Sequence, residues 1–499
     1  MALDLRPAAA VPSPLIVASH RGPFAKGADG TWRRKVNGVF AAMDPTLREV
    51  RGTWVCWNHA EEGGEGGEGE AGTARHLEVL EDGQHLYHVH ELLLREEEAK
   101  AFYEGFTTEA LWPILFCFPS QLAFFQRELW GTYQAINRRF AEAIAALAAP
   151  GGTVWVQDFH LMLLPGLLRQ LRPDLRIGFF LHTAFPPPDV FGILPWREEL
   201  LAGVLGSDLA GFHIPLYANN FAACCARYLN TEADWRHLET EGSPLQPRIA
   251  YERVHFKGRA VEVGSFGVGA NRPEMARLST DPGIRARAEA LRAQMGVAHL
   301  ALSAERLDYV KGPLERLEAL DLFFLRYPEW RGRFTLLQIA VPTREGVDAF
   351  EHLRRQVNER VGALNGRWGT ATWQPVVNLH RAHPLPELVE LYLAADLCFV
   401  TPLRDGMNLV AKEYALCRED GLVVLSEFAG AAVELPEAIQ VNPFDPEGVA
   451  EALHRALSMS EEERRARFQA MKARCEARDL AWWNQAFLER LDEVSHARA

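Results

Sequence analysis

Short apolar runs recur along the chain, and each ends in a polar or glycine-containing turn. Many of them are separated by longer stretches in which apolar residues repeat with the 3.6-residue period of a helix. This alternation predicts parallel, doubly wound α/β sheets. The predicted strands are residues 15–18, 53–57, 154–156, 177–181, 209–212, 261–266, 300–303, 334–339, 376–379, 397–400 and 423–425. The clearest predicted helices are residues 133–147, 162–171, 313–326, 347–364, 388–395 and 446–456.

The alternation weakens between residues 230 and 300, where a hairpin-like segment is followed by a basic helix. A boundary near residue 270 would leave two halves, each with its own sheet. Ligands of open α/β sheets bind beyond the carboxyl ends of the strands, so two such halves facing each other would form a deep cleft. The acidic, glycine-rich segment 61–72 is expected to be a flexible exposed loop. The final stretch is expected to be helical, with a packing face made of Trp482, Trp483, Phe487 and Leu491.

Composition limits the classes of protein to which this chain can belong. The chain has 499 residues, 48% of them hydrophobic, which is enough for a full-sized core, and a net charge of −13. That charge argues against a nucleic-acid-binding protein but permits a local basic pocket for a small phosphorylated ligand. The seven cysteines form no CxxC pair, and no apolar run reaches the roughly twenty residues of a membrane span. We therefore expect a cytoplasmic protein with reduced thiols, no metal site built from cysteines and no membrane partner.

Residues 401–414, TPLRDGMNLVAKEY, are the most informative segment. A buried strand precedes them, and a helix is predicted from Asn408 onward. Asp405 stands where a helix N-cap would stand, so the N–H groups of residues 406–409 would point outward as an anion site. Glu413 lies eight residues later, just over two helical turns, so both carboxylates can face one ligand. The alternative is an ordinary strand–helix unit with a capping aspartate.

Residues 305–317, ERLDYVKGPLERL, follow another predicted strand and precede a helix opened by proline. Arg306 and Lys311 are five residues apart across the turn, so they could clamp a diphosphate and stabilise its charge as it leaves. The alternative is a surface salt-bridge pair with the nearby Asp308 and Glu315.

Polar residues also follow the strands near residues 156 and 181: Asp158 and His160 after the first, His182 after the second. Side chains there would point into the mouth of a cleft. The alternative for both histidines is a satisfied place in the core, and His160 fits that alternative better.

Two further cations stand after strands. Arg21 lies in the turn ASHRGPF, ahead of Gly38, and Arg344 follows residues 334–339. A glycine that opens a helix after a basic loop suits close approach to a phosphate. A plain solvated arginine is the alternative for Arg344. No HExxH, GxSxG, Walker A or DxD arrangement suited to a catalytic site is found.

Together the segments QDFHLMLLP, ILPWREELL, RLDYVKG, TPLRDGMNLVAKEY and LSEFAGAA resemble the retaining glycosyltransferases of the trehalose-6-phosphate synthase type, glycosyltransferase family 20. The resemblance runs from about Leu15 to Leu491. It implies the GT-B fold, in which two Rossmann-like domains face each other across a cleft and a C-terminal helix crosses back. The implied domains are an acceptor-binding domain at residues 1–268, a donor-binding domain at 269–475 and the crossing helix at 476–499.

The resemblance also implies a role for each matching residue. Arg306 and Lys311 would hold the donor diphosphate, with Asp405 on the donor glucose and Glu413 on the donor ribose. His182 would contact the glucose near the reacting carbon, and Asp158 would contact the acceptor hydroxyls. Gly38 would let the diphosphate approach, and the backbone around Asn408, Leu409 and Val410 would support the donor. The phosphorylated acceptor would be surrounded by Arg21, Trp57, Tyr103, Trp112 and Arg344.

Some pieces depart from the trehalose branch of this family. The chain reads SHR at 19–21 and Asn37-Gly38, where that branch usually reads SNR and Gly-Gly, and it reads FHIPLYANNF after Gly211. These pieces are similar to glucosylglycerol-phosphate synthases, whereas LLQIAVPTRE, with Arg344, is closer to the trehalose branch. We therefore expect ADP-glucose and glycerol 3-phosphate as substrates in osmolyte synthesis, with glucose 6-phosphate as the alternative acceptor.

The implied reaction is a front-face substitution with retention. The leaving diphosphate takes the acceptor proton, so no side-chain nucleophile, metal or cofactor is expected. A separate phosphatase would act on the product, and formation of a homo-oligomer is left open. A non-catalytic sugar-phosphate sensor would have lost the residues named above, and this chain keeps them.

Overall fold

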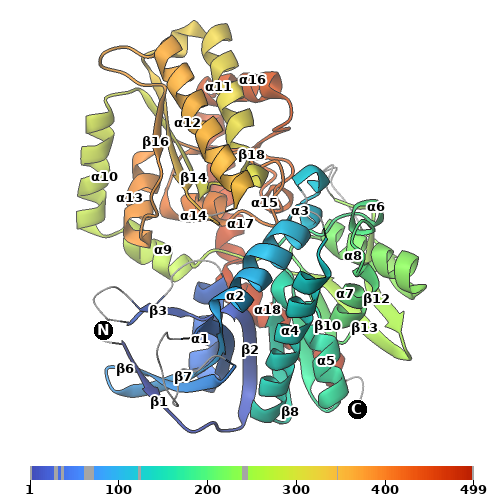
Figure 1. Ribbon diagram of the computed structural model, residues 1–499. Helices are drawn as coiled ribbons and strands as arrows, with labels where there is room; N and C mark the ends of the chain where they lie inside the picture. Colours follow the sequence, from blue (N-terminus) through green and yellow to red (C-terminus); the bar gives the residue numbers. More distant parts are fainter. Residues whose placement is uncertain are drawn as a thin grey trace. The chain divides into compact units, whose positions relative to one another are not determined.

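The computed structural model describes residues 3–26, 32–34, 39–60, 72–121, 125–238, 246–344 and 347–496. The chain forms two compact units. The first lies within Met1–Glu239, Pro247–Phe266 and Asn484–Ala499, and the second within Thr240–Gln246 and Gly267–Trp483. The chain leaves the first unit after Phe266 and returns to it inside helix α18 (Leu480–His496), and each unit is built on its own large sheet (Figure 1).

The first unit holds an eleven-stranded sheet in the order β1-β6-β7-β5-β2-β8-β9-β10-β13-β12-β11. The strands from β7 to β13 are parallel, and antiparallel strands extend the sheet at both ends. The parallel run β7-β5-β2-β8-β9-β10 has the 3-2-1-4-5-6 order of a doubly wound sheet, which reverses between β2 and β8. The bounds are β1 (Leu3–Pro7), β2 (Ser13–Arg21), β5 (Thr53–His59), β6 (Ala74–Glu81), β7 (Gln84–Leu94), β8 (Ala148–Gln157), β9 (Arg176–Phe180), β10 (Leu209–Phe212), β11 (Glu232–His237), β12 (Ile249–Phe256) and β13 (Arg259–Ser265).

The rest of the first unit is mainly helical, with a short antiparallel pair formed by β3 (Phe24–Lys26) and β4 (Trp32–Arg34). The element η1 is a π-helix, and the others are α-helices or single 3₁₀ turns. The bounds are α1 (Val39–Val50), α2 (Glu96–Ala99), η1 (Lys100–Leu111), α3 (Trp112–Leu115), η2 (Pro119–Gln121), α4 (Arg127–Leu147), η3 (Phe159–Leu161), α5 (Leu164–Leu171), α6 (Pro188–Phe191), α7 (Arg197–Val204) and α8 (Pro215–Leu229).

The second unit holds a six-stranded parallel sheet in the order β16-β15-β14-β17-β18-β19, again 3-2-1-4-5-6, which reverses between β14 and β17. The strands are β14 (His299–Arg306), β15 (Phe334–Val341), β16 (Val376–Leu379), β17 (Leu397–Val400), β18 (Leu422–Ser426) and β19 (Ile439–Val441). The helices are α9 (Arg272–Ser279), α10 (Pro282–Met295), η4 (Tyr309–Lys311), α11 (Pro313–Arg326), η5 (Pro328–Trp330), α12 (Asp348–Trp368), α13 (Leu385–Ala394), α14 (Leu409–Cys417), α15 (Ala431–Glu434), α16 (Pro446–Leu457) and α17 (Glu461–Ala477).

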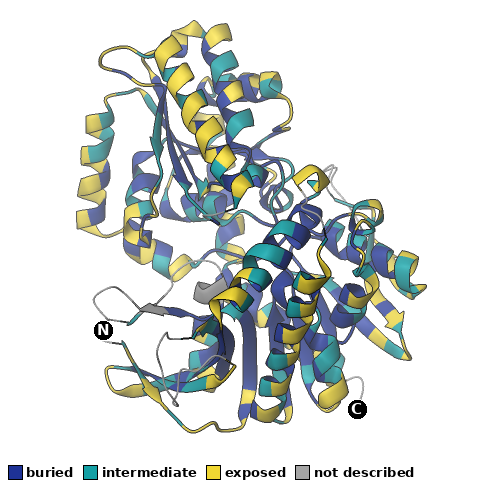
Figure 2. Ribbon diagram, viewed as in Figure 1, coloured by how far each residue is buried: buried dark blue, intermediate teal, exposed yellow. Residues whose placement is uncertain are grey.

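Strands buried on both faces explain why the apolar runs were visible in the sequence. In β17, Cys398 and Val400 belong to one core cluster, whereas Leu397 and Phe399 belong to the cluster on the other face of the sheet. Figure 2 shows the central strands of both sheets as buried and the outer faces of the surrounding helices as exposed. Every predicted strand overlaps an observed parallel strand, so the predicted doubly wound architecture is confirmed.

Several elements were not predicted. Strands β6 and β7 form a hairpin through Asp82 and Gly83, both with positive φ (49° and 81°), as a tight hairpin turn requires. The C-terminal stretch predicted as helical is two helices, α17 and α18, separated at Arg478 and Asp479. Of the predicted loop 61–72, all but Gly72 lies outside the described residues. No helix in the described ranges is long and apolar enough to span a membrane.

Helix α18 packs on the first sheet through a site that two glycines create. The Phe487 ring stacks on Trp155 with centroids 4.6 Å apart. A Cβ on Gly178 in β9 would lie 2.8 Å from the Phe487 ring, and one on Gly211 in β10 would lie 2.6 Å from it. Of the predicted packing face, Phe487, Leu491 and Trp483 are buried, whereas Trp482 is partly exposed and lies beside Arg478.

We expect Gly211→Ala to destabilise the chain by about 1–3 kcal/mol, because the added methyl overpacks the site that Phe487 fills. Thermal unfolding followed by calorimetry measures the shift. Gly131→Ala is the matched control, since no atom within 4 Å of its new Cβ opposes it and alanine favours the interior of α4 by up to about 1 kcal/mol. Equal shifts in the two variants would contradict this account of the contact.

Candidate active site

The strand order places polar residues at one point of the first sheet. Strands β2 and β8 are neighbours at the reversal, with Ala18 opposite Val156. Arg21 ends β2, and Asp158 directly follows β8. The reversal of a doubly wound sheet leaves a crevice at the carboxyl ends of its strands, so these two residues stand where a ligand would bind.

Arg21 is held by aromatic rings. Its guanidinium carbon lies 3.7 Å from the centroid of Trp57, its parallel-sheet partner on β5, and 5.8 Å from that of Tyr103 on η1. Burial lowers the pKa of Arg21 below its ordinary value, although the group stays a cation at neutral pH. Trp112 begins α3 and is buried, with its ring 5.8 Å from that of Phe159. The result is an oriented cation beside flat apolar surfaces.

Asp158 has a strained backbone. Its φ and ψ are 72° and 169°, a region that residues other than glycine adopt at a cost of about 1–3 kcal/mol. Its N–H donates to the Phe180 carbonyl at 2.7 Å, and its carboxylate accepts the His182 N–H at 3.2 Å. His160 is buried and stacks on the His20 ring at 3.7 Å, which agrees with the core alternative for that histidine.

His182 follows β9 and is half-buried. Its Nε2 lies 2.8 Å from Oε1 of Gln157, and its carbonyl accepts a hydrogen bond from Nε2 of His213 at 3.1 Å. Burial lowers the pKa of His182 well below its ordinary value of 6.5, and the neighbouring His213 lowers it further. The imidazole is therefore neutral at pH 7. Gly38, the remaining predicted site residue of this unit, lies outside the described residues.

The second sheet gathers charged residues at its own reversal point. Arg306 ends β14 and is exposed. Lys311 donates to the carboxylate of Asp405, beyond β17, at 2.6 Å, and both side chains are largely buried. Asn408 donates to the same carboxylate at 3.1 Å. The alternative that gave Lys311 a surface pairing is therefore wrong, because its partner is Asp405.

The predicted helix start needs correction. Asn408, not Asp405, is the N-cap: its Oδ1 accepts the Ala411 N–H at 3.2 Å, and α14 begins at Leu409. Asp405 is held elsewhere, because its N–H donates to the Phe428 carbonyl and its own carbonyl accepts from Gly430. The N–H groups at the start of α14 are therefore those of Leu409 and Val410, later than predicted.

Two predicted residues have buried partners. Glu413 accepts a hydrogen bond from the Tyr392 hydroxyl at 2.7 Å, and burial raises the pKa of its carboxyl from 4.5 to about 6. Arg344 lies 3.1 Å from the carboxylate of Asp308, with both side chains buried. The solvated alternative for Arg344 is therefore wrong.

Sequence reasoning missed a buried pair next to Arg306. The side chains of Glu305 and Arg316 form an ion pair that is almost completely removed from solvent. Burial raises the pKa of Glu305, and the positive charges of Arg316 and Lys311 oppose that rise. Both residues lie in the segment 305–317, which also contains Arg306, but sequence spacing does not show which charged side chains are buried. Gln157 and Tyr392 were also missed, because sequence spacing does not show which polar side chains come into contact in the fold.

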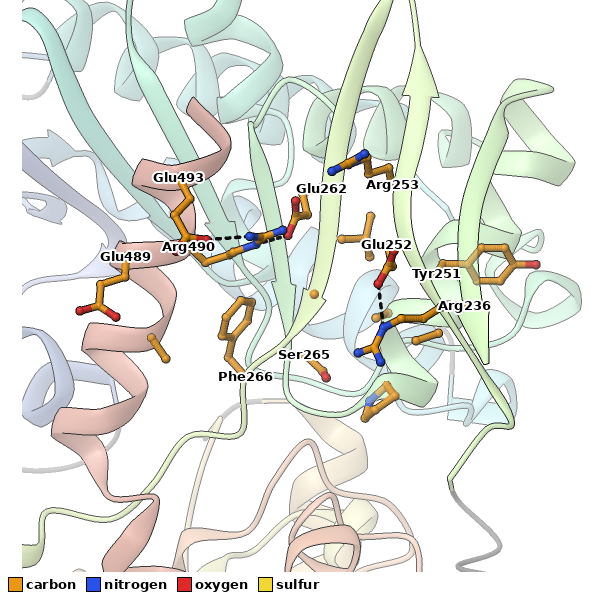
Figure 3. A pocket seen from close by; sticks show the side chains of 16 residues that line it. Arg236, Tyr251, Glu252, Arg253, Glu262, Ser265, Phe266, Glu489, Arg490 and Glu493 are labelled. Carbon is orange, nitrogen blue, oxygen red and sulfur yellow. Dashed lines mark hydrogen bonds and ion pairs between the residues drawn. The ribbon is translucent and has the colours of Figure 1, made fainter. Parts of the chain in front are cut away.

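A hollow of about 510 Å³ lies elsewhere in the first unit, between α18 and strands β12 and β13 (Figure 3). Its wall is charged, and most of these charges pair with one another. Arg236 lies 2.7 Å from Glu252, and Arg490 bonds both Glu262 and Glu493. None of the predicted site residues lines this hollow. Over the described parts of the chain, no group of three or more His, Cys, Asp or Glu side chains is arranged to hold a metal ion.

Comparison with known proteins gives consistent matches over nearly the whole chain. Residues 11–493 match the model of the family described as glycosyltransferase family 20. Trehalose-6-phosphate synthase of Mycobacterium avium is 40% identical over 465 residues, covering 93% of this chain and 91% of that protein. A bifunctional trehalose-6-phosphate synthase/phosphatase of Thermoproteus tenax is 39% identical over 497 residues, and the chain spans 64% of its length.

Solved structures agree. The alpha,alpha-trehalose-phosphate synthase (UDP-forming) of Burkholderia vietnamiensis aligns with a TM-score of 0.85 and 32% identity, covering 98% of this chain and 99% of that one. The Escherichia coli protein bound with UDP-2-fluoro glucose aligns with a TM-score of 0.83 and 30% identity, covering 96% of this chain and 98% of that one. The expected GT-B fold is thereby confirmed.

The shifted pKa of Glu413 predicts a pH-dependent stability effect. Its folded value, about 6, exceeds the ordinary 4.5. The stability linked to this group is therefore fully present below about pH 4.5 and is lost as the pH rises through about 6. Glu413→Gln should raise the free energy of unfolding by about 2 kcal/mol at pH 7.5 and hardly at all at pH 4.5.

Urea unfolding at the two pH values measures this difference. Glu462→Gln, an exposed substitution on α17, is the control for loss of a carboxylate. The same change at both pH values, or a loss of stability at pH 7.5, would contradict the assignment.

Proposed function

The chain belongs to glycosyltransferase family 20, and from that membership we propose that it transfers glucose, with retention, from a nucleoside diphosphate glucose to glucose 6-phosphate, as a trehalose-6-phosphate synthase, with release of the nucleoside diphosphate. The observation that carries the proposal is the 40% identity to a protein of that name over more than nine-tenths of both chains. The acceptor differs from the one we expected from the sequence. The departures at residues 19–21 and 37–38 are short, whereas the identity extends over 465 residues.

We propose that the second unit binds the donor. Arg306 and Lys311 would hold the diphosphate together with the N–H groups of Leu409 and Val410, which the cap at Asn408 leaves at the start of α14. The carboxylate of Asp405, fixed by Lys311, would accept hydroxyls of the glucose. Glu413 would accept hydroxyls of the ribose. This arrangement combines cations for a diphosphate with carboxylates for sugars.

The acceptor would bind to the first unit. Arg21 offers a cation for the phosphate of the acceptor, and Trp57 and Tyr103 hold it in place. Asp158 would orient the attacking hydroxyl, with Trp112 nearby in the same unit. The buried Arg344 would supply a second fixed positive charge for the acceptor. Gly38 would leave room for the diphosphate.

The mechanism needs no covalent intermediate. The acceptor hydroxyl attacks the anomeric carbon on the face from which the diphosphate leaves, and the leaving phosphate oxygen takes the hydroxyl proton. Arg306 and Lys311 stabilise the charge that grows on this oxygen. His182 would bind a glucose hydroxyl close to the reacting carbon. Positioning of two anionic substrates supplies much of the remaining rate enhancement.

Glycerol 3-phosphate is the second candidate acceptor, with ADP-glucose as donor. Three short sequence segments favour this acceptor because they are similar to glucosylglycerol-phosphate synthases: SHR at 19–21, Asn37-Gly38 and FHIPLYANNF. Both acceptors carry a phosphate that Arg21 could bind, so the reaction and the proposed donor site are the same for the two. A separate phosphatase would follow in either case.

We expect Arg306→Ala to lower kcat by roughly two orders of magnitude or more, because a cation beside the leaving diphosphate is lost. Initial rates of nucleotide release measure this, and Arg306→Lys should recover part of the activity. Arg354→Ala is the matched control, since Arg354 is an exposed arginine on α12 that pairs with the neighbouring Glu351. Unchanged turnover in a folded Arg306→Ala protein would rule the role out.

The acceptor is tested by pairing ADP-, UDP- and GDP-glucose each with glucose 6-phosphate and with glycerol 3-phosphate. Nucleotide release that requires glucose 6-phosphate is the expected result. Release that requires glycerol 3-phosphate would overturn the main proposal in favour of the second candidate. Release with neither acceptor would contradict both.

A further inference from the structure

We propose that Gln157 is a positioning residue that holds His182 in one tautomer, with the proton on Nε2, so that Nδ1 is the hydrogen-bond acceptor offered to substrate. The inference deepens the proposed function, because it gives a defined chemical state to a residue that would contact the donor glucose.

The proton position follows from the contact between the two side chains. Gln157 is the last residue of β8 and is completely buried. Its Oε1 lies 2.8 Å from Nε2 of His182. An amide oxygen can only accept a hydrogen bond, so Nε2 of the imidazole must carry the proton.

The orientation of the amide has its own support. Nε2 of Gln157 points to Sδ of Met43, a buried residue of α1, at 3.8 Å. Thioether sulfur is a weak acceptor and has no proton to donate, so it suits the NH₂ end of the amide rather than the oxygen end. A reversed amide would place NH₂ against His182 and oxygen against sulfur. The contacts on both sides of Gln157 therefore favour the same orientation.

Other contacts fix the histidine but leave its tautomer undetermined. The backbone N–H of His182 donates to Asp158, its carbonyl accepts from His213, and its ring lies 4.8 Å from that of Phe180. The ionisable partners in these contacts are Asp158 and His213. Burial keeps the ring neutral at pH 7, so the proton bonded to Gln157 is its single N–H and Nδ1 is basic. A neutral amide maintains this state over a wide pH range because it does not titrate.

The test is ¹⁵N-histidine NMR of the full chain without substrate, with His182→Gln used to assign the signal. We expect His182 to show the Nε2–H tautomer from pH 6 to pH 8. In Gln157→Leu the signal should change to a mixture of tautomers, and kcat should fall by roughly 100-fold through misplacement of the ring, with a smaller change in the donor KM. Gln356→Leu, an exposed substitution on α12, is the control.

Gln157→Glu separates positioning from packing. A carboxylate still accepts the Nε2 proton, so the tautomer should persist, but its negative charge favours the imidazolium. The fall in kcat on the acidic side of its pH profile should therefore occur at higher pH than in the wild-type protein. Above that pH the activity should be recovered. A merely structural role for Gln157 would not shift this fall in kcat.

An Nδ1–H tautomer in the wild-type protein, or an unchanged tautomer and kcat in folded Gln157→Leu, would overturn the proposal. These results are independent of the acceptor. The NMR signal needs no substrate, so failure of every acceptor in the activity assay would refute the proposed function and leave the tautomer measurement standing.

Discussion

Each sheet of this protein reverses its strand order at one place, and that constraint determines where polar chemistry can occur. The central parallel strands are buried, so their interiors admit almost only apolar side chains. Polar residues can appear where a strand ends, and the crevice at a reversal leaves room for a ligand. Arg21 and Asp158 follow the reversal of the first sheet. Arg306 and Asp405 stand at that of the second, Arg306 at the end of β14 and Asp405 beyond β17.

The charges at the second reversal are arranged in pairs that hold one another. Lys311 with Asp405, Arg344 with Asp308 and Arg316 with Glu305 are all largely removed from water. Such pairs add little net stability, because desolvation offsets most of their attraction, but removing one partner is costly. Their value here is geometric. They hold the carboxylate of Asp405 and the backbone around Arg306 in place.

Much of the fold could be predicted, because a strand buried on both faces appears in the sequence as a continuous apolar run. The positions of Asp158, His182 and Glu413 could be predicted for a related reason, since each stands at the end of a strand or on the helix that follows one. The N-cap of α14 at Asn408 could not be predicted from the sequence. Asp405 is held by Phe428 and Gly430, more than twenty residues away, and no local pattern shows that contact. Gln157 was missed because only the folded chain brings its amide to His182.

Asp158 has a consequence for how this chain can evolve. Its backbone conformation is one that glycine adopts without strain, so the fold alone would favour glycine at that position. Drift toward greater stability therefore works against the carboxylate, and under the role proposed for Asp158, selection for acceptor binding opposes that drift. A descendant released from catalysis could lose the aspartate and fold better. A sugar-phosphate sensor could then evolve readily from the enzyme, because loss of the aspartate relieves backbone strain and requires no new structure.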